Sequence, residues 1–354
     1  MRNNIILITV MTLLCFIVNS ASTLAASLIE DRSKITILTY HRIGEDHYPQ
    51  TSLRKDDFIE HIKELQTGDY NILSLSTALN KVQNKEIIPP KTVVITFEGA
   101  YKSAFLNGMK LLLQKEIPFT IFYSSDKADE NIEEYMSWKD LKSIAKNKFV
   151  TIGTLPASYS RLISEDTITI TKSLNKARSR YRENFGKEAE FLAYPFGEFS
   201  DELKELARTR GYKAAFGLHS GPYYHGYDPF AIPRFSLTQE FGDIERLRLI
   251  SDTLPLPITE IVPGSAIIKQ KLELGFTLPE ALNSESENIN CFLSGYSKPL
   301  TEVLGRRVEI RSNEEIESER MRLNCTLPKT IQDPDDPKNI TTQWRWLGLL
   351  FYKG

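Results

Sequence analysis

The sequence lacks an excess of charge of either sign, because 44 Lys and Arg residues stand against 46 Asp and Glu residues, for a formal net charge of -2. This balance argues against a nucleic-acid-binding surface and against a basic membrane patch. Histidine and cysteine are scarce, at five and three residues. The composition, 41% hydrophobic and 25% charged, is typical of a globular protein, and 354 residues leave room for one large domain and a small one.

Long apolar runs are missing except at the amino terminus. There Arg2 precedes the apolar run Ile5–Val18, which is too short to span a membrane comfortably, and small residues follow over Ser20–Ser27. This pattern predicts a signal peptide over residues 1–26 and an exported protein, periplasmic or extracellular, with no membrane span once the signal is removed. An uncleaved anchor is the alternative.

Without that segment two cysteines remain, Cys291 and Cys325. Two cysteines in an exported chain can pair without leaving a thiol over. We therefore predict one disulfide in the C-terminal region. Two buried free thiols are the alternative.

The stretch around Thr92–Phe97 is the most clearly predicted strand, and the rest of the chain is interpreted around it. It is rich in β-branched residues and follows Pro89 and Pro90, which favours a strand buried on both faces of a parallel sheet. The chain then turns and enters an amphipathic helix that begins near Tyr101. The carboxyl end of such a strand is where α/β enzymes place their chemistry.

Strands and helices alternate about this centre. The alternation predicts a parallel, barrel-like α/β domain. The strands that we expect are 35–40, 92–97, 118–123, 149–153, 191–194, 213–216 and 231–235.

The pattern changes near the C-terminus. Residues 251–265 contain three prolines and are predicted to form a linker. Period-2 runs follow, so we expect a small all-β module over 266–354. Trp344 and Trp346 share one face of its last strand, where they would either stack on sugar rings or pack in a core, and the core is the more common place for Trp.

The stretch Thr96–Tyr101 reads Thr-Phe-Glu-Gly-Ala-Tyr and resembles the first motif, Thr-Phe-Asp-Asp-Gly-Tyr, of the NodB-type polysaccharide deacetylases, carbohydrate esterase family 4. The resemblance extends over residues 35–250. It implies a distorted (β/α) barrel with its site at the carboxyl ends of the strands. It also implies an ancestral hydrolase that removes N-acetyl groups from amino-sugar polymers with a divalent metal such as zinc.

The motif residues that would hold the metal are replaced. Glu98 stands where the family has its general base, and Gly99 stands where the family has a metal-binding Asp. The stretch Ile152–Tyr159 resembles the family's histidine motif, with Leu155 and Tyr159 in place of the two histidines. Leu cannot ligate a metal and Tyr is a poor substitute for imidazole, so we expect no metal cofactor.

Other stretches resemble further segments of the family's sequence pattern. They include the segments around Tyr40, Tyr194 and Pro233, although the family often has an Arg where this chain has Ala193. The resemblance implies a cleft that contacts a carbohydrate polymer. The residues expected to line it are His41, Tyr101, Tyr159, Pro195, Phe196, Gly197 and Arg234.

Three functions fit these observations. The first is a catalytically degenerate domain that binds glycan, and the second is a scaffold protein of the cell envelope. The third is an active deacetylase with a relocated site formed by His41, Glu98 and His219. No protein partner is indicated.

Overall fold

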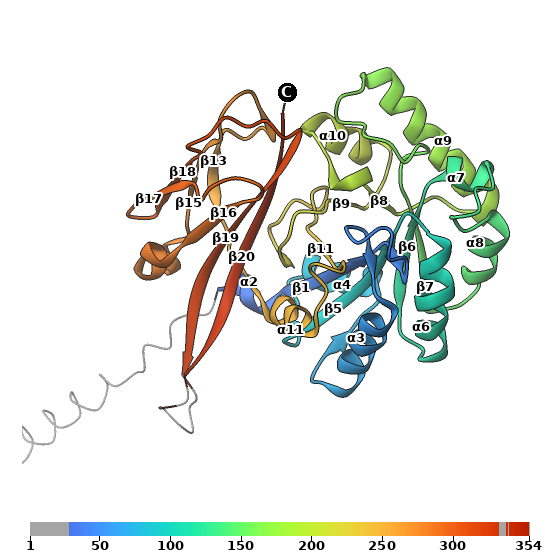
Figure 1. Cartoon of the computed structure of the whole chain (residues 1–354), viewed down its shortest axis with the longest axis horizontal. Coiled ribbons are helices and arrows are strands. Elements are labelled where there is room, and N and C mark those ends of the chain that lie inside the picture. The colour runs from blue at the N-terminus through green and yellow to red at the C-terminus, as the bar shows by residue number, and fades with distance from the viewer. Residues whose placement is uncertain (1–27, 333–337, 339, 354) are drawn as a thin grey trace, which may run out of the picture.

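The computed structural model describes residues 28–332, 338 and 340–353. The predicted signal peptide, 1–26, lies outside these residues. The chain forms a curled α/β half-barrel followed by β-rich sheets, as Figure 1 shows. Within the described ranges, no helix is both long enough and apolar enough to cross a membrane.

The barrel is built on a 9-stranded sheet whose main path runs β10-β1-β5-β6-β7-β8-β9. Neighbouring strands on this path are parallel except for β10 and β1. The strands of the path are β1 (Lys34–Tyr40), β5 (Thr92–Glu98), β6 (Phe119–Tyr123), β7 (Val150–Thr154), β8 (Phe191–Ala193), β9 (Ala214–Phe216) and β10 (Tyr223–Tyr224).

Two short strands complete the sheet. β4 (Asn71–Ile72) pairs with β5, and β11 (Phe235–Ser236) pairs with β1. Just before β11, Ile232 makes a parallel bridge to Phe216 at the end of β9. The segment 232–236 therefore touches both ends of the sheet and curls it into the predicted distorted barrel.

The last predicted barrel strand, 231–235, is shorter than expected. It consists of the bridge at Ile232 and of β11, which begins at Phe235. Pro233 explains the break, because proline has no N–H to donate to a strand ladder.

Helices cover the outside of the barrel (Figure 1). In α3 the buried residues Phe58, His61, Ile62 and Leu65 recur at intervals of three or four, which places them on one face against the sheet. The main helices are α3 (Lys55–Thr67), α4 (Leu75–Gln83), α6 (Lys110–Gln114), α8 (Trp138–Ile144), α9 (Thr167–Phe185), α10 (Asp201–Thr209) and α11 (Ile244–Asp252).

The C-terminal part consists of two sheets that pack face to face around an apolar core. One runs β12 (Leu254–Pro255), β20 (Ile340–Lys353), β19 (Arg320–Gln332) and β16 (Asn290–Leu293), with β14 (Ile267–Ile268) also on β20. The other runs β13 (Thr259–Val262), β15 (Glu273–Thr277), β18 (Arg307–Arg311) and β17 (Leu300–Leu304). A 3-10 helix, Glu280–Asn288, interrupts the otherwise all-β pattern.

The stretch predicted as a linker, 251–265, is instead part of these sheets. It supplies β12 and β13, and Leu254 and Leu256 are buried. Proline is tolerated in β12 because that strand lies at the edge of its sheet. The prolines therefore mark sheet edges here, and the apolar residues between them anchor the segment.

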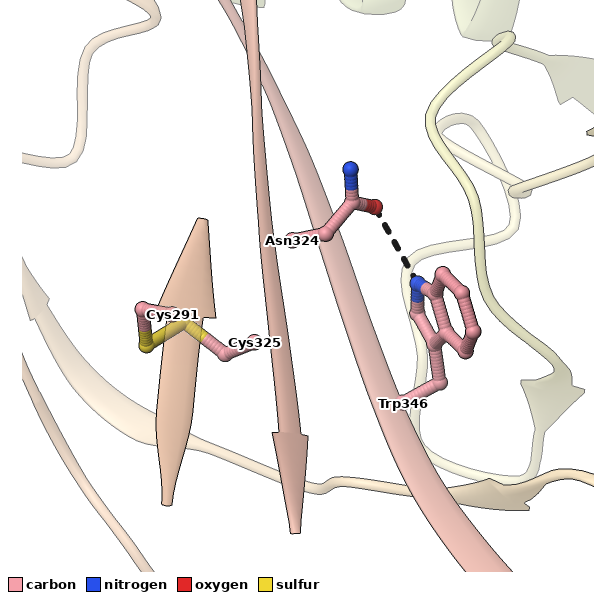
Figure 2. Close-up of a disulfide and its surroundings, with 4 residues drawn as sticks. All are labelled: Cys291, Asn324, Cys325 and Trp346. Atoms are coloured by element: carbon pink, nitrogen blue, oxygen red, sulfur yellow. Dashed lines mark hydrogen bonds between the residues drawn. A yellow bond between two sulfur atoms is a disulfide. The ribbon is translucent and has the colours of Figure 1, made fainter. Parts of the chain in front are cut away.

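The predicted disulfide is present between Cys291 and Cys325, and both residues are buried. They lie directly opposite each other on β16 and β19, as Figure 2 shows. Trp346 points to the other side of the sheet, where its indole N–H donates to Asn324 Oδ1 at 3.1 Å. Its ring meets the edge of Phe235 in the barrel at 5.5 Å, so Trp346 is packed between the two parts of the chain.

Removing the disulfide should destabilise the C-terminal sheets. The bond joins residues 34 positions apart, and a loop of that size is expected to contribute about 3–4 kcal/mol. The double variant Cys291→Ala/Cys325→Ala should therefore lose about 3–4 kcal/mol of unfolding free energy in urea, and the wild type should lose a similar amount in reductant. Equal stability with and without reductant would contradict this prediction.

Candidate functional site

The centre of the candidate site is Glu98, the last residue of β5. Side chains alternate along a strand, so Glu98 points the same way as Val94, which lies in the apolar cluster inside the barrel. Glu98 is fully buried. A carboxylate in such a place needs a charged or hydrogen-bonding partner, because an unpaired buried charge is strongly unfavourable.

Arg234 is that partner. Its Nη2 forms an ion pair with Glu98 Oε2, and its Nε donates to the carbonyl of Gly217 at 2.8 Å. The guanidinium also lies 5.4 Å from the ring centre of Phe122. Arg234 is as fully buried as Glu98, so the two form an ion pair inside the barrel.

The other oxygen of Glu98 faces Tyr159 and His41. The Tyr159 hydroxyl donates to Oε1 at 3.2 Å, and His41 Nε2 lies 3.9 Å from the same oxygen, which is too far for a hydrogen bond. Burial, with a further contribution from Glu98, raises the pKa of Tyr159 well above its usual value, so the hydroxyl keeps its proton. Burial lowers the pKa of His41, and the opposing effect of Glu98 does not restore it.

A stacked pair of rings covers this cluster. Tyr159 lies 5.2 Å from Phe196 with the planes only 6° apart. Phe196 belongs to the turn Pro195–Gly197, in which its φ is 58° and that of Gly197 is 74°. A Cβ on Gly197 would lie 2.2 Å from the backbone nitrogen of Leu218, so only glycine fits that position. The predicted residues Tyr159, Pro195, Phe196 and Gly197 are therefore brought to the mouth together with Glu98.

Tyr101 forms the other side of the mouth. Its ring packs on Tyr135 at 4.8 Å, and the guanidinium of Arg42 lies 3.9 Å from its centre. Arg42 also lies 4.1 Å from the ring of Tyr48, which is exposed. Arg42 therefore lies between the buried ring of Tyr101 and the exposed ring of Tyr48.

The residues present do not fit the divalent metal that the resemblance implies. Gly99 has no donor, and a Cβ added there would lie 2.5 Å from the ring of Tyr101. Leu155 is fully buried in the apolar cluster inside the barrel. The hydroxyl of Tyr159 is already engaged with Glu98.

The relocated site of His41, Glu98 and His219 is not formed. His219 packs against Phe199 at 5.6 Å, and its Nε2 pairs with the hydroxyl of Tyr227 at 3.1 Å. Among the described residues, no group of three or more His, Cys, Asp or Glu side chains could hold a metal. The structure gives this alternative no support, because His219 turns toward Phe199 and Tyr227, and a loop position after a strand does not determine which way a side chain turns.

The pairing of Arg234 with Glu98 was not predicted from the sequence. There Arg234 was expected only to line the cleft, and Ala193 was noted as standing where the family often has an arginine. The two paired residues are 136 positions apart. The sequence carried no signal for this pairing, because it follows from the register of β11 on β1, in which Leu38 pairs with Phe235 and Arg234 turns inward.

Comparisons with known proteins agree with this fold. Residues 85–215 match the family model for polysaccharide deacetylase. The poly-beta-1,6-N-acetyl-D-glucosamine N-deacetylase of Staphylococcus aureus (strain MSSA476) is 24% identical over 228 aligned residues, covering 57% of this chain and 78% of the relative. The putative polysaccharide deacetylase YxkH of Bacillus subtilis (strain 168) is 21% identical over 207 residues, covering 58% and 72%.

Two solved structures show the same barrel. The Streptococcus pyogenes deacetylase PplD in complex with acetate superposes with a TM-score of 0.56 at 16% identity, over 61% of this chain and 96% of that one. IcaB from Ammonifex degensii superposes with a TM-score of 0.57 at 18% identity, over 62% and 97%. At these identities the likeness concerns the fold, and it confirms the predicted barrel.

Breaking the buried ion pair should be costly, and removing both partners less so. Arg234→Met and Glu98→Gln should each lower the unfolding free energy by about 3–5 kcal/mol, because each leaves a buried charge unpaired. The double variant should lose clearly less than the sum of the two. The same substitutions at the ion pair Arg311–Glu302, whose side chains are 51% and 48% exposed, serve as the control and should cost less than about 1 kcal/mol. Additive losses at the buried pair would contradict its assignment.

Acid should destabilise the fold partly through His219. Burial lowers the pKa of His219 to about 3, whereas an unfolded histidine titrates near about 6.5. Stability from the neutral ring is thus complete above about pH 6.5 and is lost as the pH falls toward about 3. His219→Gln should shrink the difference in unfolding free energy between about pH 7.5 and pH 5 by about 2 kcal/mol.

The matched control for this measurement is His47→Gln at an exposed position. It should leave the difference between the two pH values unchanged. A His219→Gln variant with the full wild-type difference would show that the ring is not buried in its neutral form.

Proposed function

We propose that the polysaccharide deacetylase domain of this chain binds an amino-sugar polymer at the mouth of its barrel and does not hydrolyse it. The observation that carries the proposal is the state of Glu98, whose two oxygens are engaged by Arg234 and Tyr159 while the side chain is fully buried. A general base must come within about 2.6–3.2 Å of the group whose proton it takes. A carboxylate enclosed in this way lacks access to a water at the substrate.

The positions that would hold a metal support the same conclusion. Gly99 and Leu155 offer no donor atom, and Tyr159 uses its hydroxyl on Glu98. The electrophilic assistance that a divalent ion gives to amide hydrolysis has no ligand set among these residues. The residue at the position of the general base and the residues at the metal positions are therefore altered together, at the same end of the barrel.

Binding is supported by the aromatic rims of the mouth. Tyr159 and Phe196 form a half-buried stacked pair, and the exposed ring of Tyr48 lies on Arg42, which in turn covers the buried ring of Tyr101. Flat aromatic faces suit the apolar faces of sugar rings. The name of the Staphylococcus aureus relative, a deacetylase of poly-beta-1,6-N-acetyl-D-glucosamine, makes an N-acetylglucosamine polymer the class of ligand to test first.

We further propose that the protein acts outside the cytoplasm. The disulfide Cys291–Cys325 persists in an oxidising compartment, and the amino-terminal pattern of residues 1–26 is that of a signal peptide. In this proposal residues 35–250 form the glycan-binding domain and 266–354 form a β module that packs against it.

Binding should depend on the ring of Tyr159 rather than on its hydroxyl. Titration of the wild type with N-acetylated chitohexaose should be saturable, and Tyr159→Ala should weaken binding roughly tenfold through loss of the stacking surface. Tyr159→Phe keeps the ring and should bind nearly as tightly as the wild type. The measurement is isothermal titration calorimetry, with acetate assayed in the same samples.

Two results would count against the proposal. The first is saturable binding that is identical in Tyr159→Ala. The second is acetate release by the wild type that disappears in Glu98→Gln, because that result would show Glu98 acting as a base.

A further inference from the structure

The long hairpin β19–β20 has two different faces. Along β19 the residues Met321, Leu323, Cys325 and Leu327 lie in the core between the two C-terminal sheets. Because side chains alternate along a strand, Arg320, Arg322, Asn324 and Thr326 point the other way. Figure 2 shows this division, with Asn324 and Trp346 on the side opposite the disulfide.

The second face lies on the mouth of the barrel. The hydroxyl of Tyr352 accepts from the backbone N–H of Phe199 at 3.3 Å and donates to the carbonyl of Gly197 at 3.4 Å. Arg320 Nη1 donates to the carbonyl of Phe196 at 3.3 Å. The hairpin therefore contacts the same turn whose Phe196 ring covers Tyr159 and Glu98.

The charges at this contact do not balance. Glu198 is buried and pairs with Arg161 at 2.9 Å and Arg320 at 3.6 Å. Arg161 also pairs with Glu319, and Glu98 pairs with Arg234. Arg322, two positions along the same face, has no acceptor for its guanidinium among the residues that the structure describes.

The position of Arg322 is at the mouth. Its side chain is partly buried, and its charge helps to lower the pKa of both His41 and His219, after the larger effect of burial and that of Arg234. Burial and the neighbouring Arg320 also lower the pKa of Arg322 itself. The geometry agrees, because Arg322 lies on the same face of β19 as Arg320, whose guanidinium contacts the turn Pro195–Gly197.

Arg322 is partly buried, but its guanidinium nitrogens are not among the described side-chain atoms that are fully buried without a partner, so solvent reaches them. A cation at such a place has no counter-ion of its own and is accessible to an anion. The planar guanidinium carries five donors in an arrangement that matches two oxygens of a carboxylate or of a phosphate. An anion from a ligand would therefore supply the missing counter-charge and would replace water as the acceptor.

We propose that Arg322 binds an anionic substituent, a carboxylate or a phosphate, on the polymer that occupies the mouth of the barrel. The inference rests on the proposed function, because it assigns the chemistry of the ligand at that same mouth. The C-terminal sheets then contribute a specificity residue to the site, and the polymer recognised is acidic rather than neutral.

The test compares three hexamers of N-acetylglucosamine that differ in one substituent. The probes are chitohexaose, the hexamer oxidised to carboxylates at C6, and the hexamer phosphorylated at O6. The full chain should bind at least one anionic hexamer roughly 10-fold to 100-fold tighter than chitohexaose at low salt. The advantage should shrink as salt is added, because screening weakens charge pairs. The tighter of the two anionic hexamers identifies the carboxylate or the phosphate as the group recognised.

Variants assign the effect to one residue. Arg322→Gln should lower the affinity for the anionic hexamer to about that for chitohexaose, and Arg322→Lys should recover part of it by restoring the charge. Arg311→Gln, on β18 and 51% exposed, is the matched control and should keep the full preference. The thermal midpoint of Arg322→Gln should be no lower than that of the wild type, since no contact of its guanidinium is lost.

The outcomes separate this inference from the proposed function. Equal binding of neutral and anionic hexamers would overturn the role of Arg322 and leave glycan binding in place. A preference that survives in Arg322→Gln would overturn the assignment to this residue. Failure of all three hexamers to bind would overturn both proposals.

Discussion

The ion pair between Glu98 and Arg234 is the constraint on which the barrel's mouth depends. A carboxylate at the end of β5 points into an apolar interior, and it is acceptable there only with a cation beside it. Arg234 lies in the segment 232–236, which bridges β9 and pairs with β1. The same segment therefore closes the sheet and supplies the cation that neutralises Glu98. Tyr159 completes the arrangement by donating to the second oxygen.

The C-terminal sheets are part of the same arrangement. Tyr352 and Arg320 hold the turn Pro195–Gly197, the ring of Phe196 in that turn stacks on Tyr159, and Tyr159 contacts Glu98. A continuous chain of contacts thus leads from β19–β20 to the buried ion pair. The β module consequently has a structural role at the mouth.

Much of the fold could be predicted from local pattern. The β-branched run at 92–97 forms β5, and the period-2 run at 290–293 forms β16. Both could be predicted because a strand buried on two faces is apolar throughout, and a strand buried on one face alternates between apolar and polar residues. The failures have local causes too. The prolines of 251–265 suggested a linker, but the apolar Leu254 and Leu256 between them bind that stretch to the sheet edge. His219 was expected at the rim, and its side chain packs against Phe199 instead.

The sequence by itself determined that the side chains of Gly99 and Leu155 carry no metal-ligating atom in any conformation, and that Cys291 and Cys325 could pair. Only the tertiary structure decided which charges meet. Glu98 and Arg234 are 136 positions apart, and their contact follows from the register of β11 on β1. The face of β19 that carries Arg322 is likewise decided by which side of that strand packs into the core. Strand alternation is visible in a sequence, but the partner that each face meets depends on how distant strands are placed in space.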